Sequence, residues 1–192
     1  MFLSYFHNYK SVHPQTVSLE AIVRLVRTDA QLAELTTQFR ADGSDAVKER
    51  TPLFGVAVLF EGGKKEKHIS AVTGLSLVDI DHVEPELLPL LRQKANADPH
   101  TLFSYVTISG QGLRIIYAYM LAGGCTLQQQ RDFYPKTFAA GNDYYSQLLG
   151  VPSDLKCKNI GRLRGLAHDP DAWFNPDAEP FMPPWIEERW QQ

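Results

Sequence analysis

The sequence has few of the residues that mark a disulfide-stabilised or membrane-spanning protein. Among 192 residues only two are cysteines, Cys125 and Cys157. They form neither a spaced metal-binding quartet nor a disulfide framework, and such cysteine usage is typical of the reducing cytoplasm. No stretch approaches the ~20 apolar residues that span a bilayer, and the N-terminus lacks the basic region and small-residue cleavage site of a signal peptide. We therefore expect a cytoplasmic protein that does not bind a membrane.

Charge of one sign is not in excess either. The formal net charge is −3, which excludes a uniformly basic nucleic-acid coat protein. A local basic groove is nevertheless enough to bind nucleic acid. Positive side chains gather in two short stretches, namely Lys64, Lys65 and Lys67 in the first, and Lys156, Lys158, Arg162 and Arg164 in the second.

The hydrophobic pattern predicts strands and helices that alternate along the chain, with hairpins in the middle. One helix begins after Ser18, a typical N-cap residue, and carries an apolar stripe at three- and four-residue spacing. In chain order we expect a strand at 1–9, helices at 19–29, 30–41 and 45–50, a hairpin within 53–72, a strand at 75–81, a helix at 85–98, strands at 101–109 and 113–120, a helical region from 126 to about 149 that is broken near Pro135, and a short strand at 161–167. This order is typical of an α+β fold with helices packed on a mostly antiparallel sheet.

Prolines are concentrated after Asp169, at positions 170, 176, 180, 183 and 184. Such a segment is typical of a surface wrap or a linker. We therefore expect one domain at residues 1–172, followed by a proline-rich tail at 173–192 that could lead to a further C-terminal region of a longer chain.

The apolar run at 75–81 ends in two aspartates, Asp79 and Asp81. Alternate residues of a strand point to the same face, so the two carboxylates share a face with Cα atoms ~6 to 7 Å apart. They repel each other unless a cation or a basic side chain lies between them. Carboxylates at this spacing suit Mg²⁺ or Mn²⁺, although a solvated turn that caps the next helix explains an isolated pair equally well. The apolar residues before them predict a strand in the middle of a sheet and favour the metal site.

A second stretch that could carry chemistry is the connection Ser109-Gly110-Gln111-Gly112 between two predicted strands. Glycines allow backbone N–H groups to approach an anion, and the serine hydroxyl adds a donor. Arg114 follows on the same face as Gly112 and could hold a phosphate. The alternative is an ordinary hairpin turn that requires glycine.

A third stretch places one acid, Asp154, before the bases Lys156, Lys158, Arg162 and Arg164. In the strand-like segment 161–167, the two arginines share a face. A carboxylate among cations fits a site that holds a metal ion together with a triphosphate or a template backbone. A solvated loop with local ion pairs is the alternative.

The order of the three stretches resembles the three motifs of archaeo-eukaryotic-type primases, which are primase–polymerase enzymes. Those motifs are a strand that ends in two aspartates, then a Ser-Gly-x-Gly connection followed by a basic residue, then an aspartate ahead of an arginine-rich strand. The resemblance is closest to the virulence-associated E (VirE) N-terminal domain family. It extends to the opening FHNYKSVHPQTVSLEAIVRLVRTD, to KERTPLFGVAVLFEGG and to RLRGLAHDPD, and thus covers roughly residues 1–172.

The resemblance implies a primase-type catalytic core with an RRM-like sheet, and it implies a role for each matching residue. Asp79, Asp81 and Asp154 match the catalytic metal ligands. Ser109, Gly110, Gly112 and Arg114 match the nucleotide loop, and Arg162 matches the basic residue of the third motif. Lys156, Lys158 and Arg164 complete the expected phosphate-binding set.

The implied reaction adds nucleotides on a single-stranded DNA template by a mechanism with two Mg²⁺ or Mn²⁺ ions and no organic cofactor. Nucleoside triphosphates are the expected substrates, and a helicase-type ATPase is an expected partner in the replication of a bacterial mobile or phage-like element. Arg114 stands where the wider superfamily commonly has histidine, and arginine cannot act as a neutral base near pH 7. A catalytically degenerate nucleotide- or nucleic-acid-binding module therefore stays open, as does a metal-dependent phosphoesterase or nuclease.

Overall fold

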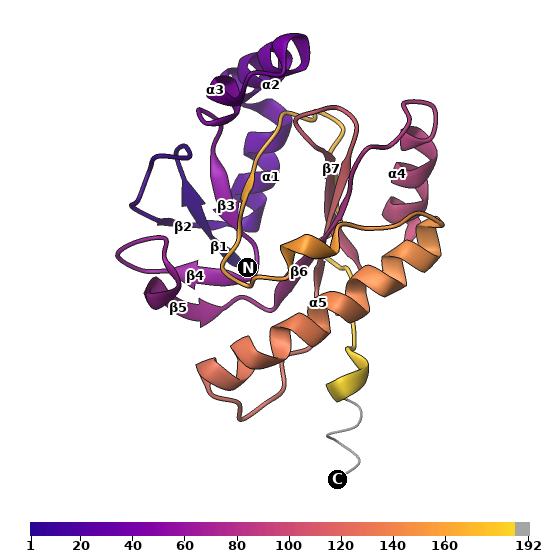
Figure 1. The fold of residues 1–192 in the computed structure, drawn as a ribbon. Helices are drawn as coiled ribbons and strands as arrows, with labels where there is room; N and C mark the ends of the chain where they lie inside the picture. The colour runs from indigo at the N-terminus through magenta and orange to yellow at the C-terminus, as the bar shows by residue number, and fades with distance from the viewer. Residues whose placement is uncertain (187–192) are drawn as a thin grey trace.

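The computed structural model describes residues 1–186 and has the α+β fold expected from the sequence (Figure 1). Within this range the strands form two four-stranded antiparallel sheets and one two-stranded hairpin. The hairpin consists of β4 (Val58–Phe60) and β5 (Ile69–Val72). Of the helices in the described residues, none has the length and apolar character needed to cross a membrane.

The first sheet joins the N-terminus to a segment near residue 164. Its strand order is β2 (Gln15–Ser18), β1 (Phe2–Phe6), β3 (Leu53–Gly55) and β9 (Leu163–Gly165). The helices α1 (Leu19–Thr28), α2 (Ala30–Asp42) and α3 (Asp45–Lys48) lie between β2 and β3 in the chain. The Ser18 hydroxyl accepts a hydrogen bond from the backbone N–H of Ala21, so the predicted N-cap is confirmed.

The second sheet has the order β10 (Trp173–Phe174), β7 (Thr101–Val106), β8 (Leu113–Ala118) and β6 (Leu75–Ile80). The helices α4 (Leu88–Ala97) and α5 (Leu127–Leu149) pack on one face of this sheet. The chain order β6–α4–β7–β8–α5 thus forms a strand–helix–strand–strand–helix unit.

Both faces of the second sheet are covered, and this determines where the polar residues lie. Val78, Ile80 and their neighbours on β8 pack against α4 and α5. Leu75 and Leu77 point the other way, into a core shared with α1 and the first sheet. Because side chains alternate along a strand, Asp79 points into the space between the two sheets.

Two predictions of local structure were wrong. The strand β6 does not lie in the middle of its sheet but ends the strand order, and its buried residues follow from layers on both faces. The backbone N–H of Asp154 donates to the carbonyl of Asp79 at 2.9 Å, which covers part of the strand's outer edge. The helix α5 is not broken at Pro135 but continues from Leu127 to Leu149. Proline removes one hydrogen bond, and the buried residues Tyr134 and Phe138 on either side of it hold this helix on the sheet.

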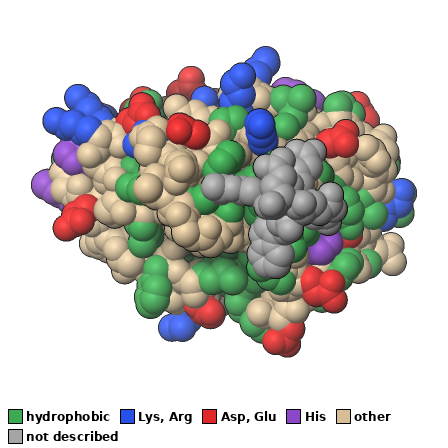
Figure 2. Space-filling model, turned by 90° about the horizontal axis from the view of Figure 1, so that it is seen from below, with side chains coloured by type: hydrophobic (Ala, Val, Ile, Leu, Met, Phe, Trp, Pro, Cys, Tyr) green, Lys and Arg blue, Asp and Glu red, His purple; other side chains and the backbone are tan. Residues whose placement is uncertain are grey.

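The described part of the proline-rich segment packs on the domain as an extended wrap. Trp173 and Phe174 form β10 on the edge of β7, and Phe181 is buried and bridges to Tyr119. The domain boundary at 172 stays a prediction, and residues 187–192 of the predicted tail lie outside the described residues. Figure 2 shows the molecule from below the view of Figure 1, and on this face acidic, basic and hydrophobic side chains are interspersed.

Candidate active-site cleft

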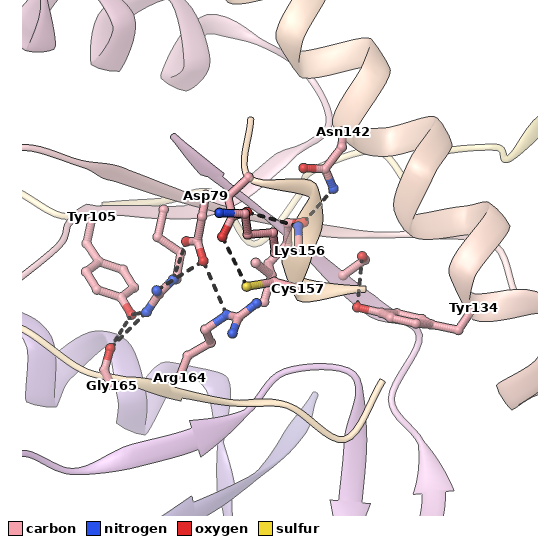
Figure 3. A network of polar contacts seen from close by, with 12 residues as sticks. Asp79, Tyr105, Tyr134, Asn142, Lys156, Cys157, Arg164 and Gly165 are labelled. Carbon is pink, nitrogen blue, oxygen red and sulfur yellow. Dashed lines mark hydrogen bonds and ion pairs between the residues drawn. The ribbon is translucent and has the colours of Figure 1, made fainter. Parts of the chain in front are cut away.

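The centre of the candidate site is an ion pair between Asp79 and Arg114. The antiparallel register of β6 and β8 places these two residues directly opposite each other. Arg114 Nε lies 2.6 Å from Asp79 Oδ1, and Arg114 Nη2 lies 3.2 Å from Asp79 Oδ2. Arg114 Nη1 donates to the Tyr105 hydroxyl and to the carbonyl oxygen of Gly165, at 2.9 and 2.8 Å (Figure 3). Each nitrogen of this buried guanidinium therefore has a partner within the protein.

A second arginine reaches the same carboxylate from the opposite sheet. Arg164 lies on β9, and its Nε is 3.2 Å from Asp79 Oδ2 (Figure 3). Arg164 is only 5% exposed, yet its Nη2 has no hydrogen-bond partner among the described residues. One carboxylate thus faces two buried guanidinium groups, which leaves a net positive charge and an unused donor between the sheets.

The charge state of Arg114 follows from the same contacts. Burial acts to lower its pKa, but the charge of Asp79, the Tyr105 hydroxyl and the hydrogen bonds to both together outweigh this effect and hold the pKa of Arg114 above its ordinary value. The guanidinium stays protonated and cannot act as a base.

Asp81 and Asp154 lie beside this pair with a different electrostatic environment. Partial burial raises the pKa of Asp81, and the negative charges of Asp79 and Asp154 raise it further, against the opposing charge of Arg114. For Asp154, burial acts to raise the pKa, but the Lys156 N–H, the Cys157 thiol and nearby cations lower it overall. The Lys156 N–H and the Cys157 thiol donate to Asp154 at 2.9 and 3.2 Å.

These side chains line one cleft of about 320 Å³ between the two sheets. Most of the residues predicted from the sequence meet there, namely Asp79, Asp81, Ser109, Arg114, Asp154, Arg162 and Arg164. Arg162 is exposed, whereas Arg114 and Arg164 are buried. Lys156 and Lys158 are exposed and lie outside the cleft lining.

The glycine-containing connection 107–112 is a tight turn whose backbone groups are largely paired. The Gly110 N–H donates to the Thr107 carbonyl, and the Ser109 hydroxyl accepts from the N–H of Gln111. Gly110 has a φ of +74°, which favours glycine. A Cβ at Gly112 would lie 2.6 Å from Thr107 Oγ1, so this position requires glycine because of close packing.

Some residues of the cleft were missed by the sequence reasoning. Lys48 and Phe39 come from α3 and α2, and the ammonium of Lys48 lies 5.9 Å from the centre of the Phe39 ring. Cys157 is buried in the lining, and only its place inside the predicted basic stretch could have indicated it. Arg40 of α2 donates to the carbonyls of residues 107 and 108 and so fixes the turn. No motif marks Lys48, Phe39 or Arg40.

The carboxylates fit a divalent cation only in part. Both oxygens of Asp79 are taken by guanidinium groups, and arginine competes directly with a metal for these lone pairs. Within residues 1–186, no group of three or more His, Cys, Asp or Glu side chains is arranged to hold a metal ion. Among the described residues, Asp81 and Asp154 form no ion pair with a guanidinium, so these two cleft carboxylates remain the candidates for holding Mg²⁺ or Mn²⁺. The role of Asp79 as a metal ligand stays a prediction.

Together these features define an α+β domain with an acid–arginine cleft between two antiparallel sheets. Residues 46–174, about two thirds of the chain, match the family model described as BT4734-like, N-terminal domain. The chain therefore belongs to the BT4734-like N-terminal domain family. The matched segment runs from α3 to β10 and contains every residue that lines the cleft except Phe39 of α2. No curated protein and no solved structure gave a significant match.

Proposed function

We propose that this domain is a primase–polymerase-like nucleotidyltransferase that adds nucleotides to a strand on a single-stranded DNA template. The observation that carries the proposal is that Asp79, Asp81 and Asp154 line the same cleft as Arg114 and Arg162, although they come from separate segments of the chain. The order of these residues in the sequence, which resembles that of archaeo-eukaryotic primases and VirE N-terminal domains, supports it further.

The proposal gives different roles to the exposed and the buried cations. Arg162 and Lys48 are exposed at the cleft and would bind the triphosphate of the incoming nucleotide. Arg114 and Arg164 are fixed by Asp79 and would supply a preorganised positive charge behind it. The unused Nη2 of Arg164 is a further donor for a phosphate oxygen.

Asp81 and Asp154 would hold the divalent cation. When bound, Mg²⁺ or Mn²⁺ would neutralise the charge of the triphosphate and of the leaving pyrophosphate. In the reaction, the 3′-oxygen of the growing strand forms a bond to the α-phosphorus, the bond to the pyrophosphate oxygen breaks, and the hydroxyl proton passes to water. We place this reaction in the replication of a bacterial mobile or phage-like element, with a helicase-type ATPase as the expected partner.

A primer-extension assay tests the proposal. Wild-type protein is incubated with a primed single-stranded template, nucleoside triphosphates and Mn²⁺ or Mg²⁺, and strand length is followed on a gel. We expect extension that falls by about 100-fold or more in Asp81→Asn and Asp154→Asn, since each removes a charge that the reacting groups require. Asp143→Asn, an exposed position on α5, is the matched control and should extend normally. Absence of extension with either ion, or full extension by both cleft variants, would refute the proposal.

A second function, nucleotide binding without catalysis, is favoured by one observation. Asp79 is neutralised by two arginines and therefore lacks a free oxygen for a metal ion. In this case nucleoside triphosphates would still bind to Asp81→Asn and Asp154→Asn, binding would weaken in Arg162→Ala, and no strand would change length. Shortening of the labelled strand without added nucleotide would instead indicate the phosphoesterase or nuclease activity.

A further inference from the structure

We propose that single-stranded DNA enters or leaves the cleft across a neighbouring hollow and stacks a base on Tyr9. The hollow has a volume of about 370 Å³ and is called the Tyr9 trough below. It shares five lining residues with the cleft, namely Lys48, Thr51, Arg162, Leu163 and Gly165. The two hollows therefore adjoin, and a strand whose end lies in the cleft can continue into the trough.

The Tyr9 ring is exposed but held in place. Its side chain is 59% exposed at the rim of the trough, outside every core cluster. The Tyr9 N–H donates to the Glu49 carbonyl at 3.0 Å, and the Tyr9 carbonyl accepts from Lys64 Nζ. The same ammonium lies 5.3 Å from the centre of the ring. Single-stranded bases stack on exposed aromatic side chains that lie beside cationic groups, and Tyr9 with Lys64 is such an arrangement.

The trough carries both basic and acidic side chains, so it can make only a few contacts with DNA phosphates. Lys48 and Arg162 line it and can contact phosphates, and Lys64 lies above the ring. Asp45 and Glu49 also line it and reduce the positive potential. Phosphate attraction alone is therefore weak, and stacking on Tyr9 must supply much of the affinity. Bases of duplex DNA are already stacked and paired, so the trough selects a single strand.

The surface on which the single strand lies can extend beyond the trough. A larger hollow of about 690 Å³ shares Glu49 with it and is lined by His7, Lys10 and Arg50 among others. Both hollows lie around the connection between β1 and β2, which contains Tyr9. The inference rests on the proposed function for its choice of DNA, whereas the surface itself is defined by the residues above.

The test measures binding of the full chain to fluorescently labelled oligodeoxythymidine by anisotropy. Tyr9→Ala should weaken binding about 5- to 150-fold, the range that corresponds to the loss of one base–aromatic stack. Tyr9→Phe should keep wild-type affinity because it preserves the ring. Phe2→Ala removes an aromatic ring that is 60% exposed elsewhere on β1 and should have no effect.

Salt dependence and competing nucleic acids test the two parts of the surface separately. Two phosphate contacts predict that the logarithm of the association constant falls with the logarithm of salt concentration with a slope of about −1.4, and Lys48→Ala should reduce the slope by about 0.7. The inference is overturned if wild-type protein does not bind the oligomer, if Tyr9→Ala binds like wild type, or if duplex DNA or oligouridine binds as well as oligodeoxythymidine.

Primer extension distinguishes a failure of this inference from a failure of the proposed function. Tyr9→Ala should require more template for half-maximal rate but reach the wild-type maximum. If extension depends on Asp81 while Tyr9→Ala binds DNA normally, the trough is wrong and the proposed function stands. If Tyr9→Ala loses DNA binding while no extension occurs, the trough stands and the proposed function fails.

Discussion

Replacing Asp79 with asparagine should destabilise this protein strongly, although asparagine has nearly the same shape. Arg114 and Arg164 would then remain buried without a counter-charge. Removing one partner from a buried ion pair costs about 3–5 kcal/mol. The free energy of unfolding of a typical domain is about 5–15 kcal/mol, so this loss is a large fraction of the total stability.

Replacing Asp81 with asparagine should change the stability of the protein in the opposite direction. Its pKa is raised by partial burial first and by the charge of Asp79 next. A carboxyl whose pKa is higher in the folded than in the unfolded state loses stability as pH rises through these values. At neutral pH its charge is therefore unfavourable, and Asp81→Asn should leave stability equal or slightly higher. Solvent screening keeps this gain small because Asp81 is only partly buried.

Urea unfolding at pH 7, followed by far-UV circular dichroism, measures both effects. With a denaturant slope of about 2 kcal/mol per molar, the midpoint should fall by about 1.5–2.5 M for Asp79→Asn. The midpoint of Asp81→Asn should not fall. In the double variant Asp79→Asn with Arg164→Gln, the wild-type charge balance returns, and part of the lost stability should return with it.

An Asp79→Asn midpoint equal to that of wild type would refute this expectation. That result would mean that Asp79 does not compensate the two arginines, and the metal-ligand role predicted from the sequence would regain support. If Asp79→Asn yields no folded protein, the double variant provides the comparison.

Further predictions concern glycines and tyrosines. Gly112→Ala should lower the free energy of unfolding by about 1–3 kcal/mol by overpacking. The new Cβ would lie 2.6 Å from Thr107 Oγ1 and 2.9 Å from a backbone carbonyl oxygen. Thermal denaturation measures this loss of stability. Gly141→Ala should lower the melting temperature despite its better helix propensity, because the new Cβ would collide with the buried Tyr117 hydroxyl. Adding Tyr117→Phe should restore part of that loss, and an additive result would contradict the collision. Burial raises the pKa of Tyr134 from 10.0 to about 12, so the folded state binds more protons above pH 10. The urea midpoint should thus fall as pH rises from 10 to 12, and a constant midpoint would contradict it.

Local features of the fold were predictable from the sequence because they depend on neighbouring residues. The Ser18 cap and the apolar stripe of α1 specify that helix by hydrogen bonding and periodicity within one turn. Gly43 ends α2 in the left-handed conformation expected of glycine. The prediction of a break at Pro135 was wrong because a proline inside a helix costs about 3 kcal/mol locally, and the burial of Tyr134, Phe138 and further residues of α5 on the sheet outweighs this cost.

The edge position of β6 could not be predicted from its residues. An uninterrupted apolar strand is expected in the middle of a sheet, but it is equally buried when layers cover both of its faces. Here α5 covers one face, and α1 with the first sheet covers the other. The sequence pattern records burial, whereas strand order depends on connections between distant segments.

The sequence by itself determined the α+β class and the identity of most of the charged residues that meet in the cleft, because strand alternation and motif order are encoded along the chain. Only the tertiary structure decided what these residues contact. Asp79 pairs with Arg114 through the register of two strands, and with Arg164 because a strand of the other sheet passes opposite. Tyr9 lies beside the cleft, in the Tyr9 trough, only because separate segments of the chain pack together. Contacts between residues far apart in the chain depend on packing in three dimensions, and no local pattern specifies them.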